Sequence, residues 1–186
     1  MLSELAGAAR ADGQKVLRAL SIGCASGEEP YTLRLCWEFD DKRPWEELGL
    51  KVDAFDAGEH MVERARAARY PPGNLKELPD GWLERAFEAV DGEDRLRERF
   101  RRGVSFFVAD HREWAPGEGR RFNIIFCRNL AFMYFDEIGR QKTLKRLAGW
   151  IRPGGALVVG NRDMVPECEA FRSETVWAAP FVYARV

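Results

Sequence analysis

A glycine-bounded turn followed by two glutamates is the first feature of the sequence that can do chemistry. Gly23 and Gly27 enclose three small residues, and Glu28 and Glu29 follow directly. Glycine lets a backbone approach a ligand closely, and the acidic Asp56 follows the next segment, 50–55, which alternates as a strand. An acidic residue at such a position can accept hydrogen bonds from both hydroxyls of a ribose. The combination is typical of a site for an adenosine-containing ligand.

The turn fits the phosphate-binding signatures poorly. Gly23 and Gly27 form Gly-x-x-x-Gly, not the Gly-x-Gly-x-x-Gly of dinucleotide folds, and no Gly-Lys-Ser/Thr is present. Glu28 and Glu29 would repel a pyrophosphate, but they tolerate a ligand with a cationic amino-acid end. S-adenosylmethionine carries a sulfonium and an ammonium, so we expect it as the cofactor.

The elements that must position these residues alternate between strands and helices. We expect helices after Pro30, around Met61 to Ala68, and from an N-cap at Asp136 to Ile151, where Pro153-Gly154-Gly155 ends the helix. We expect strands over residues 16–22, 50–55, 104–109, 122–126 and 156–159. Because parallel strands need crossover connections, this order predicts an α/β fold with a mostly parallel sheet and helices on both faces.

Polar residues stand where four of the expected strands end. In parallel sheets ligands bind outside the carboxyl ends of the strands. We therefore expect one cleft lined by Glu28, Glu29, Asp56, Asp110, Arg128 and Asn129.

Two regions depart from the alternating pattern. Residues 71–103 read as an insertion or small subdomain, with a short helix over 82–89 and an Asp91-Gly92 turn. Its run from Arg95 to Arg102 can bind an acidic partner or can be a solvated edge. Residues 175–177 and 181–184 are expected to form a closing antiparallel pair.

Composition excludes several classes of function. The chain has 186 residues, with 29 basic and 30 acidic side chains, so we expect one domain and no electrostatic footprint of a nucleic-acid binder. No apolar run approaches the ~18 residues of a membrane span, and no signal-peptide core is present. The four cysteines show no Cys-x-x-Cys spacing, so we expect no metal site and reduced thiols in a cytoplasmic protein.

Two blocks of the sequence resemble a known family. The first is Ser21-Ile22-Gly23-Cys24-Ala25-Ser26-Gly27-Glu28-Glu29-Pro30-Tyr31-Thr32, and the second is Phe122-Asn123-Ile124-Ile125-Phe126-Cys127-Arg128-Asn129, followed by Tyr134-Phe135-Asp136. Together they look like the signatures of the CheR-type chemoreceptor methyltransferases. The resemblance implies a class I methyltransferase fold and methyl transfer from S-adenosylmethionine to glutamate carboxylates of a protein.

The resemblance also implies a role for individual residues. It places Gly23, Cys24, Ala25 and Gly27 in the cofactor loop, Glu29 on the cofactor and Asp56 on its ribose. Asp110 and His111 stand where the family has an Asn-Leu pair beside the adenine. Arg128 and Asn129 match the pair next to the methionine end, and Tyr134, with Asn129, is expected at the reacting centre.

The sequence departs from the family pattern at three further places. About fifteen residues precede the first strand, so we expect the family's N-terminal helical domain to be absent. Four residues, not three, separate Asn129 from Tyr134, and Gly160-Asn161-Arg162-Asp163 replaces the family's Gly-His-Ser-Glu. These differences bear on the methyl acceptor, which is a protein or a small molecule, more than on the cofactor. The alternative hypothesis is therefore a cofactor-binding but catalytically weak interaction module.

Overall fold

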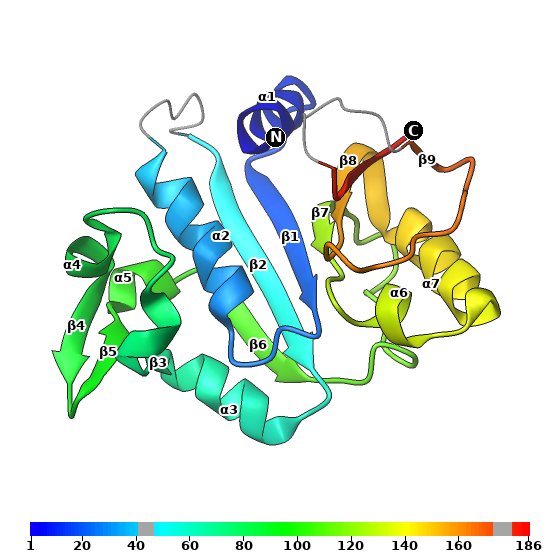
Figure 1. The fold of residues 1–186 in the computed structure, drawn as a ribbon. Helices are drawn as coiled ribbons and strands as arrows, with labels where there is room; N and C mark the ends of the chain where they lie inside the picture. Colours follow the sequence, from blue (N-terminus) through cyan, green and yellow to red (C-terminus); the bar gives the residue numbers. More distant parts are fainter. Residues whose placement is uncertain (41–46, 173–179) are drawn as a thin grey trace.

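The computed structural model describes residues 1–40, 47–172 and 180–186. Among them, seven strands form one sheet in the order β6-β2-β1-β7-β8-β10-β9 (Figure 1). Its strands are β1 (Val16–Ile22), β2 (Gly49–Asp56), β6 (Val104–Val108), β7 (Phe122–Phe126), β8 (Ile151–Val158), β9 (Phe171–Arg172) and β10 (Val182–Arg185). β1, β2, β6, β7 and β8 pair in parallel, while β10 is antiparallel to both β8 and β9. The α/β fold with a mostly parallel sheet is thus confirmed.

Helices cover both faces of this sheet and build a core on each. On one face Leu5 of α1 and Trp37 of α2 pack in a cluster with β1, β2 and β8. On the other, Phe132 of α6 and Leu144 of α7 pack in a second cluster with the opposite side chains of the strands. The helices are α1 (Leu2–Ala11), α2 (Glu28–Phe39), α3 (Glu59–Ala67), α6 (Ala131–Tyr134) and α7 (Glu137–Trp150).

A small antiparallel sheet lies beside α2, at the left of Figure 1. Its order is β3-β5-β4, and Asp91-Gly92 forms the expected turn of its hairpin. Arg95 of β5 pairs with Glu88 of β4 at 2.6 Å, and Arg101 donates to the carbonyl of Arg66 at 2.6 Å. Several basic side chains of the 95–102 run therefore have partners within the chain. The region contains β3 (Arg69–Tyr70), η1 (Pro72–Leu75), α4 (Trp82–Ala86), β4 (Phe87–Val90), β5 (Glu93–Leu96) and α5 (Glu98–Arg101).

Two local predictions were wrong. The helix expected over 82–89 ends at Ala86, because the following residues pair as β4. The sequence spacing also predicts Ile138 on the same side of the last helix as Leu144, but six residues separate the two and rotate Ile138 by about 240°; it is 64% exposed. The first fifteen residues, for which we made no prediction, include α1.

The Pro153-Gly154-Gly155 segment does not end α7 but lies within β8. The pairing of β7 with β8 shifts register between Phe122 and Ile124, and a Cβ at Gly155 would stand 2.8 Å from the carbonyl oxygen of Asn123. The segment is therefore a bulge in a strand, where glycine permits the close approach. Of the expected closing pair, 181–184 corresponds to β10, and 175–177 lies outside the described residues.

Candidate cofactor site

The turn after β1 is held in a shape that favours glycine at both ends. Gly23 has φ of +70° and Gly27 has φ of +89°. A Cβ at Gly27 would also lie 2.9 Å from the Cβ of Ala65 on α3. The amides of Gly23 and Cys24 both donate to the carbonyl of Phe55, at 2.9 and 3.0 Å. The turn is thereby tied to the end of β2.

Asp56, the last residue of β2, supports the same turn. One carboxylate oxygen accepts from the amide of Ala25 at 3.0 Å, and the other accepts from the amide of Gly58 at 2.9 Å. A carboxylate has about four acceptor positions, so two positions remain for a ligand.

A cavity of about 600 Å³ opens at the carboxyl ends of β1 and β7. Five residues predicted to bind the cofactor line it, as does Asn129, one of the two predicted catalytic residues, together with residues of α1 and α2. The lining is Met1, Leu2, Gly23, Cys24, Ala25, Glu28, Glu29, Thr32, Leu33, Cys36, Phe126, Arg128 and Asn129. Its size is in the usual range for a small-molecule site.

Glu29 brings a partly buried negative charge to this cavity. Its carboxylate accepts from the hydroxyl of Ser21 at 2.7 Å and pairs with Arg128 at 3.2 Å. Burial raises the pKa of Glu29 above its usual 4.5, while Ser21 and Arg128 act in the opposite direction. A second cationic group in the cavity would help to keep this carboxylate ionised.

A smaller hollow of about 70 Å³ lies on the other side of Gly23, lined also by Asp56, His111 and Leu130. His111 stacks on Phe135 with ring centroids 5.1 Å apart. Burial lowers the pKa of His111, which favours the neutral ring.

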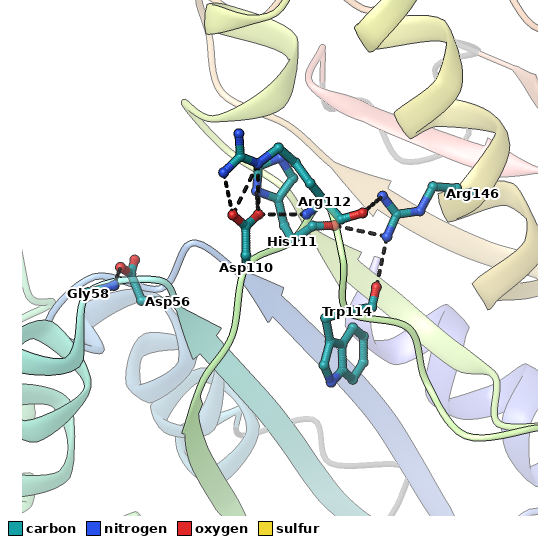
Figure 2. Close-up of polar contacts among 7 residues, drawn as sticks. All are labelled: Asp56, Gly58, Asp110, His111, Arg112, Trp114 and Arg146. Carbon is teal, nitrogen blue, oxygen red and sulfur yellow. Dashed lines mark hydrogen bonds and ion pairs between the residues drawn. The ribbon is translucent and has the colours of Figure 1, made fainter.

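The loop after β6 is fixed by two arginines, as Figure 2 shows. Arg112 donates to the carboxylate of Asp110 and holds the pKa of that group below its usual range. Arg146 of α7 donates to the carbonyls of His111 and Trp114 at 2.9 and 2.7 Å. The loop is therefore anchored to α7.

The sequence-predicted residues do not all meet. Gly27 shapes the turn and Asp110 stands beside the hollow, but neither lines a cavity described above. Tyr134 is 72% exposed and lines neither. Sequence reasoning missed Thr32, which stands on the cavity side of α2, and Arg146, whose long-range contacts leave no local signal.

Two cysteines at the site are buried and unreactive. Burial raises the pKa of both Cys24 and Cys127 to about 12, so these thiols stay protonated at neutral pH. Neither thiol is therefore suited to act as the nucleophile.

The donor set fits S-adenosylmethionine. Asp56 offers acceptors for a ribose and Glu29 offers a carboxylate for an ammonium, with Gly23 between the two hollows. Together with the strand order, this arrangement defines a class I S-adenosylmethionine-dependent methyltransferase fold.

The particular family follows from the sequence comparison. A family model described as "CheR methyltransferase, SAM binding domain" matches residues 2–177. The chain belongs to the CheR methyltransferase family, and its cofactor is S-adenosylmethionine.

Similar proteins include a probable biofilm formation methyltransferase WspC of Pseudomonas putida, 34% identical over 87% of this chain and 36% of that protein. Chemotaxis protein methyltransferase 2 of Vibrio cholerae is 26% identical over 89% of this chain and 60% of that protein. The chain thus spans roughly one third to three fifths of these relatives. Among solved structures, the N-methyltransferase NodS of Bradyrhizobium japonicum with S-adenosylhomocysteine has a TM-score of 0.45 at 14% identity, over 85% of this chain and 59% of that chain.

None of the described helices is both long enough and apolar enough to cross a membrane.

Proposed function

We propose that this domain transfers the methyl group of S-adenosylmethionine to a glutamate carboxylate of a protein. The observation that carries the proposal is a cavity with the Glu29–Arg128 pair on one side of Gly23 and Asp56 on the other. Family membership supports it, and several similar proteins are named chemotaxis protein methyltransferases.

In the proposed orientation the ribose hydroxyls donate to Asp56. The ammonium of the methionine end lies at Glu29, and its carboxylate lies near Arg128. The adenine lies against the hollow beside His111, next to Asp110. Each contact pairs opposite charges or matches a donor with an acceptor.

The absence of a general base in this scheme has a chemical reason. A glutamate side chain has a pKa of about 4.3, so the acceptor is already an anion at neutral pH. When bound, S-adenosylmethionine supplies an activated methyl group. The residues of this chain then need only to orient the two reactants and exclude water, and orientation can contribute roughly 7 to 11 kcal/mol at best.

The two residues predicted at the reacting centre differ in position. Asn129 lines the cavity, and we keep it as the candidate that contacts the reacting groups. The side chain of Tyr134 is exposed, so its role stays a prediction that Tyr134→Phe tests through the rate of transfer.

The test is transfer of a radiolabelled methyl group from S-adenosylmethionine to proteins of the source cell's lysate, using the longest natural chain that contains this domain. Methyl esters of glutamate release methanol in mild alkali, whereas methylated amines do not. We expect protein-bound label that is released by alkali.

Two variants make the assay specific. Asp56→Ala is expected to abolish most transfer. Glu59→Gln removes a nearby exposed carboxylate that lines neither cavity and should leave transfer unchanged. Label that resists alkali would contradict carboxylate methylation, and cofactor binding without any transfer would favour the interaction module.

A further inference from the structure

Asp163, in the loop after β8, joins two chain segments at the carboxyl edge of the sheet. Its Oδ2 accepts from the amide of Asn129 at 2.9 Å and from the amide of Gly160 at 2.6 Å. Asn129 belongs to the loop after β7, so one carboxylate oxygen links the ends of two neighbouring strands.

The link acts on a residue in the left-handed region. Asn129 has φ of +52°, which is uncommon for residues other than glycine but is adopted by asparagine more readily than by most. The fit around it is close, because a Cβ at Gly160 would collide with Oδ1 of Asn129. The bond from Asp163 therefore holds Asn129 in one of the backbone conformations open to it.

The second carboxylate oxygen of Asp163 contributes a destabilising term to the fold. Oδ1 of Asp163 is buried and has no hydrogen-bond partner among the described residues. A buried acceptor without a partner destabilises a fold.

Asn129 and its neighbour Arg128 both line the cavity, and Arg128 pairs with Glu29. We propose that Asp163 is a positioning residue, which holds Asn129 in its left-handed conformation and so orients Arg128 and Asn129 toward the methionine end of the cofactor. The inference rests on the cofactor orientation of the proposed function, but not on the methyl acceptor.

Calorimetry with two ligands tests it. S-adenosylhomocysteine carries the amino-acid end, whereas 5′-methylthioadenosine lacks it. Asp163→Ala should weaken the binding of S-adenosylhomocysteine by about tenfold or more and leave the affinity for 5′-methylthioadenosine within about twofold of that of the parent chain. Loss of fold in general would weaken both ligands.

Two further variants test the same link between Asp163 and the amides of Asn129 and Gly160. Asp163→Asn keeps a carbonyl oxygen that can accept both amides, so it should restore affinity to within about threefold of the parent chain. Gly160→Ala disturbs Asn129 from the other side and should repeat the ligand-selective loss, which keeps the test available if Asp163→Ala does not fold.

The outcomes separate the two hypotheses. If the parent chain binds neither ligand, the proposed function fails. If it binds both and the Asp163 and Gly160 variants weaken them equally, or weaken neither, the positioning role is wrong. A loss for Asp163→Asn as large as for Asp163→Ala also contradicts it, because the backbone link would then not be what matters.

Discussion

Replacing Asp56 by alanine should weaken cofactor binding by roughly 1.5 to 3 kcal/mol. Its two oxygens already accept from Ala25 and Gly58 at 3.0 and 2.9 Å, and the positions that remain are those proposed for the ribose. Hydrogen bonds to a charged group contribute about 1.5 to 3 kcal/mol, which corresponds to about a tenfold to 150-fold rise in Kd. Part of this loss comes from the turn, because Ala25 also loses its acceptor.

The assay is calorimetric titration with S-adenosylhomocysteine and with 5′-methylthioadenosine. Both ligands contain the ribose, so Asp56→Ala should weaken them by similar factors. Asp56→Asn keeps one oxygen for the backbone amides and should cause a smaller loss. Unchanged affinity, or a loss restricted to S-adenosylhomocysteine, would refute the placement of the ribose at Asp56.

Glu29→Gln should weaken the binding of S-adenosylhomocysteine about tenfold and leave the binding of 5′-methylthioadenosine unchanged. Equal losses of affinity for the two ligands would contradict the placement of Glu29 at the ammonium. Burial raises the pKa of Glu29 above 4.5, so the contribution of Glu29 to the free energy of unfolding is complete at lower pH and declines as pH rises through the raised pKa. In thermal melts the Tm of Glu29→Gln should therefore rise relative to the Tm of the parent chain as pH increases from about 4.5 to 7. Asp136 accepts from the amide of Gly139 at 2.8 Å, so Asp136→Ala should cost about 1 kcal/mol in a urea titration, and a change under 0.3 kcal/mol would argue against this cap. Gly27→Ala should cost roughly 1 to 3 kcal/mol because of its positive φ and its contact with Ala65, and a Tm equal to that of the parent chain would show that the turn can relax.

The positions of strands were predictable where a buried strand corresponds to a continuous, mostly apolar stretch of the sequence. The runs at 16–22 and 122–126 coincide with β1 and β7, because both are short, mostly apolar runs, and Gly23 and Arg128 mark the turns that follow them. The chemistry of the site was predictable for the same reason, since the residues that end parallel strands meet at one edge.

Features that depend on pairing between distant segments were not predictable. The Pro153-Gly154-Gly155 bulge is defined by its register against β7, and the same three residues are equally typical of a helix end. Arg146 is one more basic residue of α7 by sequence, and its bonds to the carbonyls of the loop after β6 depend on how α7 packs. Tyr134 lies in a run of aromatic and apolar residues whose spacing does not distinguish the buried Phe132 from its exposed neighbour.

Asp110 shows how a departure from the family pattern can be compatible with the same ligand. An acidic residue in place of asparagine adds a negative charge beside the proposed adenine and loses a donor. The structure places Arg112 against it: the guanidinium Nε lies 3.0 Å from Oδ1, and the backbone amide donates to the same oxygen at 2.8 Å. The charge is thereby balanced locally, and the lowered pKa keeps the carboxylate ionised as an acceptor. An ionised acceptor suits the exocyclic amine of adenine, which needs only a partner for its N–H. The exchange of asparagine for aspartate therefore does not argue against adenine at the hollow beside His111.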